Sequence, residues 1–196
     1  QFFKRAGIMA STLVALAAYG QITPENLRVE QLSDNILINT PKSADENPRF
    51  SWINKAAAGT MGEVQKAYRI CVATSPEALS SGKVDVWDSK KVKSADSYLV
   101  NYKGGKLNEA TDYYWRVMVW NGKGKASKWS QTQKFTTGID SWKAKWIGAP
   151  WQNEEPQLDL KTGHCNPEFP AVPYLRKGFD VKSGIRSAKA YVTGLG

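Results

Sequence analysis

Cysteine and histidine are scarce in this chain of 196 residues, which contains two Cys and one His. Two Cys in a chain of this length are not a disulfide framework, so Cys71 and Cys165 either form one bridge or remain thiols. His164 adjoins Cys165, but a metal site needs three or four ligands at workable spacing, and the sequence does not offer them. The glycine pairs at 104–105 and 122–124 do not open a helix and are not phosphate loops. We therefore expect neither a metal nor a cofactor.

Dense runs of charge are also missing, although the formal net charge is +9. The lysines are scattered over expected strands and turns, at Lys90, Lys91, Lys93, Lys103, Lys106, Lys123, Lys125 and Lys128. A nucleic-acid surface would need basic residues clustered with aromatic or arginine partners. We therefore expect no nucleic-acid partner and a plain solvated surface, which leaves open a weak attraction to acidic polymers.

One apolar run stands near the start of the chain. Lys4 and Arg5 precede the apolar residues 8–18, which are too few to anchor a folded domain in a bilayer, and Ala18 and Gly20 place small residues at the two positions that a signal peptidase inspects. Residues 1–20 are predicted to be a signal peptide, with an N-terminal core helix as the alternative. We expect an exported protein, periplasmic or secreted, with no membrane contact after cleavage. Because the chain opens on Gln1, we also expect it to be part of a longer protein.

Alternation of apolar and polar residues, the pattern of β-strands, is abundant. In residues 113–120, the strongest run, Tyr113, Trp115, Val117 and Val119 share one face. About seven short strands with regular turn signals predict an all-β sandwich. The expected strands cover residues 27–32, continued by 35–39, then 48–52, 64–74, 84–88, 98–102, 113–120 and 129–137. The eight Trp suit either a sandwich core or surfaces that stack on sugars.

Local signals add detail to this sandwich. Alternation in residues 64–74 directs Cys71 away from the core. Ser75 followed by Pro76 predicts a single helical turn. Tyr113, six residues after Leu107 and two after Thr111, resembles the tyrosine corner of fibronectin type III domains, in which the hydroxyl ties the crossover loop back to the strand.

The chain divides into parts by pattern. Residues 21–138 are the expected sandwich, 139–145 a linker and 146–196 the start of a second β module. After a Pro- and acid-rich stretch at 151–173, alternation returns at Leu175, Lys177, Phe179, Ala188, Ala190 and Val192. Two or three strands cannot bury a core alone, so we expect this module to be incomplete and loosely held.

The order and spacing of several motifs resemble the N-terminal region of bacterial α-L-rhamnosidases. These motifs are Pro48-Arg49-Phe50-Ser51-Trp52, Gln65-Lys66-Ala67-Tyr68-Arg69-Ile70, Val86-Trp87-Asp88-Ser89, Tyr113-Tyr114-Trp115-Arg116-Val117, Trp142-Lys143-Ala144-Lys145-Trp146-Ile147-Gly148, Tyr174-Leu175-Arg176-Lys177-Gly178-Phe179 and Ala188-Lys189-Ala190-Tyr191-Val192-Thr193-Gly194-Leu195-Gly196. Two turn positions depart from the family: Lys90 stands where Gly is usual and Asn121 where Asp is frequent.

The resemblance implies a fibronectin-like sandwich followed by a jelly-roll module, both flanking a distant (α/α)6 catalytic barrel. In the family, carboxylates of that barrel carry the inverting hydrolysis of terminal rhamnose. Inversion needs two carboxyl groups roughly 6.5 to 9.5 Å apart. Glu154, Glu155 and Asp159 are the obvious acidic group here, but they adjoin Pro156 with no basic or apolar frame to tune a pKa. We expect no catalytic residue in this chain.

The sequence therefore predicts a non-catalytic N-terminal part of an exported glycoside hydrolase that removes terminal α-L-rhamnose. Its partners would be the downstream domains of the parent enzyme and, through them, a rhamnose-containing glycan. Trp151, in the polar stretch, is the candidate carbohydrate-binding residue, and Trp120 is a weaker one that we expect to pack against the second module. The alternatives are a stand-alone exported carbohydrate-binding or adhesion module and an enzyme of similar layout acting on another sugar.

Overall fold

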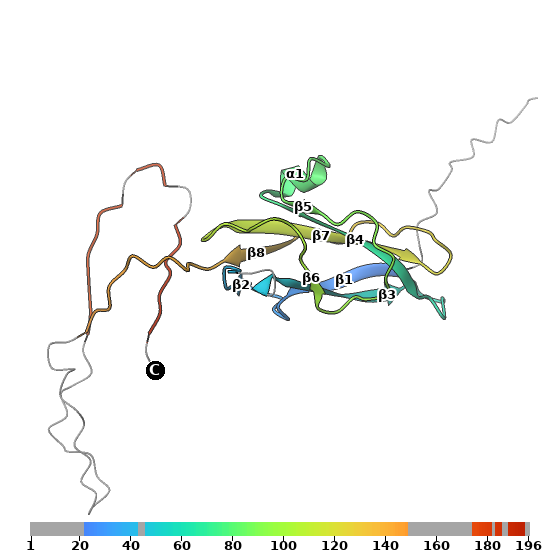
Figure 1. The fold of residues 1–196 in the computed structure, drawn as a ribbon, viewed down its shortest axis with the longest axis horizontal. Helices are drawn as coiled ribbons and strands as arrows, with labels where there is room; N and C mark the ends of the chain where they lie inside the picture. Colours follow the sequence, from blue (N-terminus) through green and yellow to red (C-terminus); the bar gives the residue numbers. More distant parts are fainter. Residues whose placement is uncertain (1–21, 43–45, 149–173, 182, 186–187, 195–196) are drawn as a thin grey trace, which may run out of the picture. The chain divides into compact units, whose positions relative to one another are not determined.

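The structure, a computed structural model, describes residues 22–42, 46–148, 174–181, 183–185 and 188–194. Residues 22–140 form two facing β-sheets, with one short helix on the outer side of one sheet (Figure 1). The elements are β1 (Ile22–Val29), β2 (Leu37–Ile38), β3 (Arg49–Ala56), β4 (Gln65–Ala73), α1 (Pro76–Ser80), β5 (Trp87–Asp88), β6 (Val100–Asn101), β7 (Asp112–Asn121) and β8 (Gln133–Thr137). The all-β sandwich expected from alternation is confirmed.

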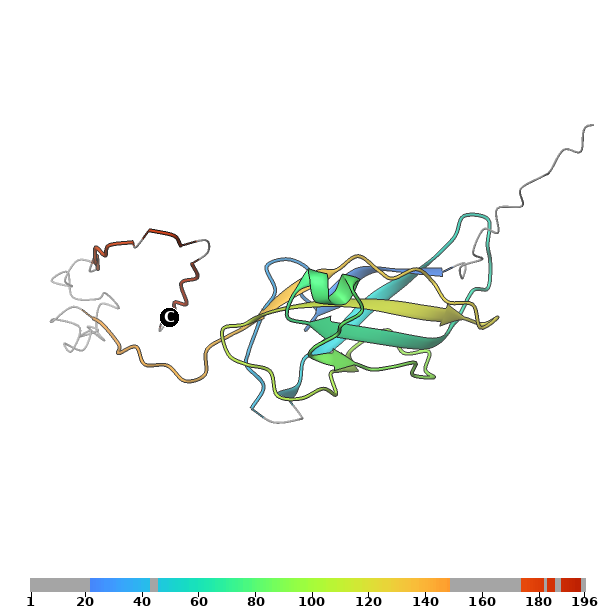
Figure 2. The ribbon, with the colours of Figure 1, turned by 90° about the horizontal axis from the view of Figure 1, so that it is seen from above.

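β7 is the central strand of the larger sheet. The strand order is β1-β3-β6 in one sheet and β2-β8-β7-β4-β5 in the other. Figure 2, seen from above, shows β7 alongside β4, with which it pairs antiparallel over nearly its whole length. Tyr113 is 3% exposed, and Trp115, Val117 and Val119 are fully buried. The predicted face of residues 113–120 is therefore the core face.

The two sheets meet through aromatic rings. Phe50 of β3 has its ring centroid 4.5 Å from Trp115 of β7 and 6.0 Å from Phe135 of β8. Near one end of the core, Trp52 packs edge-on against Tyr68 of β4 at 5.4 Å. Because truncating a buried aromatic residue costs about 3 to 5 kcal/mol, these rings account for much of the cohesion between the sheets.

Two local predictions are confirmed. The Tyr113 hydroxyl accepts a hydrogen bond from the Asn108 backbone N–H at 2.8 Å, which is the tyrosine corner. α1 is a single short helix, and the Ser75 hydroxyl caps it by accepting from the Ala78 N–H at 3.1 Å. Pro76 stands in its first turn, where a missing N–H costs nothing.

The first and last strands differ from their predicted ranges. β1 runs from Ile22 to Val29 and stops at a tight turn, because Glu30 and Gln31 adopt positive φ of 49° and 67°. β8 begins only at Gln133, so Trp129 lies before it. The reason is that the hydroxyls of Ser127 and Ser130 accept the N–H groups of Val119 and Val117, which interrupts the ladder beside β7.

Residues from Ser141 onward form a separate unit. Its described residues include no strand, so the strands expected around Leu175 and Ala190 are absent there. A strand needs a hydrogen-bonded neighbour, and alternation alone does not supply one. The large apolar side chains stay exposed, among them Trp146 at 67%, Phe179 at 83% and Val192 at 88%. The described part of the chain holds no helix long and apolar enough to cross a membrane.

Candidate functional site

Charged side chains gather on the side of the five-stranded sheet that faces away from the core. We call this side the outer face and define it by the outward residues of β4 and β7, namely Ala67, Arg69, Cys71, Ala73, Tyr114, Arg116, Met118 and Trp120. Period-two alternation puts them there, opposite the core residues of the same strands. The four outward residues of β7 are all half-buried.

α1 covers one end of the outer face. Leu79 of α1 is fully buried against Cys71 and Ala73, with Tyr114 and Trp129 packed around them. The prediction that Cys71 faces away from the sandwich core is right, but Cys71 is 1% exposed and therefore buried on this side of the sheet as well. Burial raises the pKa of Cys71 to about 11. A thiol with so high a pKa is structural and not a nucleophile.

The carboxylate of Asp88, on β5, forms ion pairs with two cations. Arg69 holds Asp88 of β5 through two hydrogen bonds, Nε to Oδ1 at 2.9 Å and one to Oδ2 at 2.7 Å. Lys90 Nζ reaches the same carboxylate at 2.8 Å. The hydrogen bonds from Arg69, with those from Lys90, hold the pKa of Asp88 well below its usual range. Asp88 is therefore an ionised partner of cations and cannot donate a proton in catalysis.

Two further cations lie over tryptophan rings. The Arg116 guanidinium is 4.4 Å from the ring centroid of Trp129, and Lys91 Nζ is 4.5 Å from that of Trp120. Arg116 also donates to the backbone carbonyl of Leu79, which joins β7 to α1. Desolvation lowers the pKa of Arg116. One face of each ring is thus occupied by the protein's own cation, which weighs against sugar stacking on Trp120.

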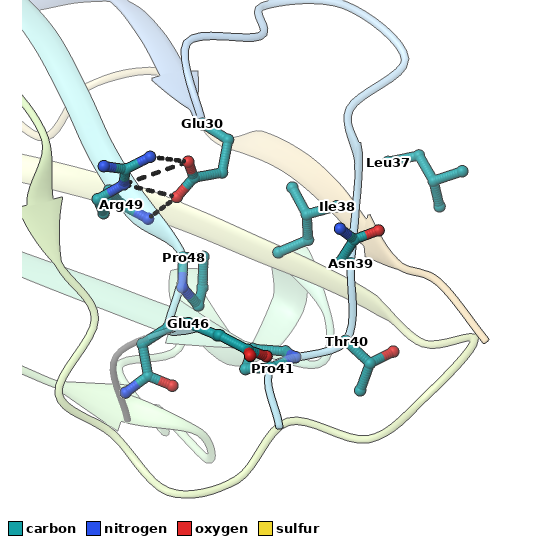
Figure 3. A pocket seen from close by; sticks show the side chains of 10 residues that line it. Glu30, Leu37, Ile38, Asn39, Thr40, Pro41, Glu46, Pro48 and Arg49 are labelled. Carbon is teal, nitrogen blue, oxygen red and sulfur yellow. Dashed lines mark hydrogen bonds and ion pairs between the residues drawn. The ribbon is translucent and has the colours of Figure 1, made fainter. Parts of the chain in front are cut away.

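A groove of about 520 Å³ lies at the other side of the sandwich, beside β2 and the start of β3. Figure 3 shows Glu30 and Arg49 joined on one wall of it, with Ile38, Pro41 and Pro48 nearby. The Glu30 carboxylate accepts four hydrogen bonds from Arg49, one from the backbone N–H and three from the guanidinium. These bonds lower the pKa of Glu30. Two carboxylates, Glu30 and Glu46, line the groove, and Glu30 is ionised and saturated by Arg49, so it cannot serve as the acid of an acid–base pair.

Most residues singled out by sequence lie outside the described residues. These are Trp151, Glu154, Glu155, Asp159, His164 and Cys165. The candidate role of Trp151 in carbohydrate binding accordingly stays a prediction, as does any bridge between Cys71 and Cys165. Within the described ranges, no group of three or more His, Cys, Asp or Glu could hold a metal ion.

Sequence reasoning missed the cluster on the outer face. Arg69 and Arg116 fall on outward positions of two strands, but only the register of β4 against β7 brings them to the same ring, that of Trp129. Pairing of strands far apart in sequence is not encoded in local alternation. An Arg at an outward position of each neighbouring strand was the one usable signal.

Two facing β-sheets with Tyr113 as a corner residue define an immunoglobulin-like β-sandwich. Residues 24–141 match the family described as the Rha78A-like N-terminal immunoglobulin domain, and the chain belongs to this family.

Relatives and solved structures agree with this assignment. An α-L-rhamnosidase of Formosa agariphila is 33% identical over 94% of this chain, which covers 21% of that protein. The crystal structure of a Streptomyces avermitilis α-L-rhamnosidase complexed with L-rhamnose superposes with a TM-score of 0.58 at 40% identity, over 66% of this chain and 12% of that one. An α-L-rhamnosidase from Dictyoglomus thermophilum gives 0.56 at 34% identity, over 64% and 14%. The chain thus spans about a fifth of the length of the first of these relatives.

Proposed function

We propose that this chain is a non-catalytic N-terminal module of a glycoside hydrolase that removes terminal α-L-rhamnose from glycans or glycosides. In this proposal the sandwich braces and positions the downstream modules that carry the catalytic carboxylates. The observation that supports it most directly is the family match over residues 24–141, together with relatives that are named α-L-rhamnosidases and are about five times as long.

The geometry of the described residues supports a structural role. The two carboxylates with the most strongly bonded environments, Glu30 and Asp88, are both saturated by arginine. Each is held ionised, whereas an inverting glycosidase needs one carboxyl group protonated before the reaction. Neither residue can serve as the general acid.

An aryl α-L-rhamnoside assay tests the proposal. The 196-residue chain is expected to release no aryl alcohol above the rate of buffer, whereas the longest protein encoded by the same reading frame is expected to turn over the substrate. Turnover by the 196-residue chain itself would contradict the non-catalytic role. A full-length protein active on another aryl glycoside but not on the rhamnoside would contradict the sugar assignment.

We propose further that the protein is exported and acts in the periplasm or outside the cell. The support is the charged and apolar pattern of residues 4–18 and the small residues before Gln21. N-terminal sequencing of the protein recovered from the producing bacterium should begin at Gln21. A mature protein that retains Lys4 and Arg5 would count against export by this route.

A further inference from the structure

The outer face, together with Lys90 and Lys91 of the segment after β5 that contacts it, carries more positive charge than negative. Four cations, Arg69, Lys90, Lys91 and Arg116, take part in the contacts described above, and Asp88 is the carboxylate among them. Asp88 is only 13% exposed and is shared between Arg69 and Lys90. Rings hold Lys91 and Arg116 in place without neutralising them, because a tryptophan ring carries no net charge. The group therefore keeps an excess of about three positive charges.

These charges are held in place before any partner arrives. Lysine and arginine side chains that are immobilised on binding cost about 0.5 to 1.5 kcal/mol each in lost rotamer freedom. Here Lys91 lies 4.5 Å from the Trp120 ring and Arg116 lies 4.4 Å from the Trp129 ring. Both rings are half-buried, and Trp120 stands on β7, the central strand of the sheet. Part of that ordering has therefore already occurred in the free protein, chiefly at Arg116, which is half-buried and also donates to the Leu79 carbonyl.

Arg116 and Lys91 are spread along β7 and do not converge on one point. Arg116 and Trp120, the latter beneath Lys91, are four residues apart on β7, which corresponds to about 14 Å. A single small anion cannot contact both ends of such a row, whereas a polymer with repeated negative charges can. With one face of each ring occupied, these rings are poor platforms for stacking nucleic-acid bases.

From these observations we propose that the outer face binds an acidic polysaccharide through its carboxylate groups. The guanidinium of Arg116 and the ammonium of Lys91 would contact two carboxylates that lie several sugar units apart along the polymer, and the sugar rings would need no stacking surface. The choice of a polyanion rests on the charges of the outer face. The choice of a polysaccharide rests on the proposed function as part of a glycan-degrading enzyme.

Binding of the 196-residue chain to polygalacturonate, a plain polyuronate, tests the proposal, with neutral dextran as the uncharged control. Polygalacturonate should bind at low ionic strength and be released as salt is raised, and dextran should not bind. Lys91→Glu should weaken binding about fivefold, since it removes one exposed ionic contact and adds one repulsion. Lys55→Glu on β3 is the matched control, because Lys55 is 68% exposed and belongs to the other sheet. It makes the same change of net charge and should leave binding unaltered.

Several results would overturn the proposal. Absence of binding to polygalacturonate at low salt would do so, and so would equal weakening by Lys91→Glu and Lys55→Glu, since only net charge would then matter. Single-stranded DNA that binds more tightly than polygalacturonate would replace the polysaccharide with a nucleic acid. Circular dichroism of Lys91→Glu separates lost binding from lost folding. The aryl rhamnoside assay uses an uncharged substrate, so failure of the binding proposal and failure of the proposed function are distinguished.

Discussion

At the scale of single residues, Tyr113 fastens the loop before β7 by one hydrogen bond to the Asn108 N–H. Tyr113→Phe leaves that N–H without its acceptor, so we expect a loss of about 1 to 1.5 kcal/mol in the free energy of unfolding, measured by urea denaturation. Tyr98→Phe is the control, because Tyr98 is 63% exposed and should change stability by less than about 0.5 kcal/mol. Equal losses of unfolding free energy in the two variants would show that the hydrogen bond from Asn108 to Tyr113 does not stabilise the fold.

Gly104 allows the closest backbone approach to an aromatic ring in the loop after β6. A Cβ at Gly104 would lie 2.2 Å from the Tyr102 hydroxyl oxygen, whereas a Cβ at Gly105 would meet nothing within 4 Å. Tyr102 is 1% exposed and its hydroxyl donates to the Gly105 carbonyl, so the ring cannot easily move. We expect Gly104→Ala to cost about 1 to 3 kcal/mol and Gly105→Ala close to nothing, by thermal or urea unfolding. A tolerated Gly104→Ala would show that Tyr102 has another position.

Asp88 gives the fold a dependence on pH with a definite sign. Its pKa is lower in the folded protein than the ordinary value of 3.8, so its ionised form stabilises the fold above about pH 4. That contribution is lost as the pH falls through the lowered folded pKa. We expect Asp88→Asn to be about 2 kcal/mol less stable than the parent at pH 7, with the gap narrowing steadily below pH 4. Urea unfolding at a series of pH values measures the gap.

A matched substitution serves as the control for this pH dependence. Asp34→Asn removes an equal charge from an exposed carboxylate whose described hydrogen bond is to the neighbouring Ser33. Its stability should follow that of the parent at every pH. A constant gap between Asp88→Asn and the parent from pH 7 to pH 2 would mean that the carboxylate's charge plays no part.

At the scale of elements, Asn121 ends β7 and holds the hairpin that follows. It is 1% exposed, and its Oδ1 accepts from the N–H groups of Lys123 and Lys125 at 3.1 and 2.9 Å. Its Nδ2 donates to Glu63 Oε2 at 3.0 Å. Asp, frequent here in the family, would keep the first two bonds and put a second carboxylate against Glu63. Glu63 therefore favours an amide over a carboxylate at position 121, because only the amide can donate a hydrogen bond to it.

A double-mutant cycle tests this pairing. Asn121→Asp should cost about 1 to 3 kcal/mol, because two carboxylates then face each other in a half-buried place. Adding Glu63→Gln restores a donor opposite the new carboxylate and should recover most of the loss. The free energies of unfolding of the parent, both single variants and the double variant give the coupling. Additive effects of the two changes would contradict a direct interaction.

The sequence predicts which residues form the core, but it does not predict the side-chain contacts on the outer face. Alternation identified Trp115 and Val117 as core because burial on one side of a sheet leaves a period of two. The cation–aromatic cluster of Arg116 and Trp129 depends on which strands pair and in what register. The departure at Lys90 is explained only by the backbone: its φ of 54° is a conformation that glycine adopts freely, and hydrogen bonds to Asp88 hold it there.

At the scale of the whole molecule, the two units differ in how their backbones are held. In the sandwich, β-ladders and a continuous aromatic core protect the chain. From Ser141 onward, the described residues form no strand, and Lys143, Lys145, Arg176 and Lys177 are all exposed. A protease needs several residues in extended form, and segments without cooperative structure open at almost no cost in free energy.

Limited trypsin digestion should therefore cut first after Lys143 or Lys145 and leave the sandwich as a resistant product. Mass spectrometry over a time course identifies the product ends. The lysines of β3 and β4, Lys55 and Lys66, are the internal control, since both are exposed yet stand on paired strands. Their cleavage must await opening of the sheet, so urea should accelerate it strongly and leave cleavage after Lys145 almost unchanged. Cleavage at Lys55 as early as at Lys145 would mean that the sandwich lacks the stability that its buried aromatic core implies.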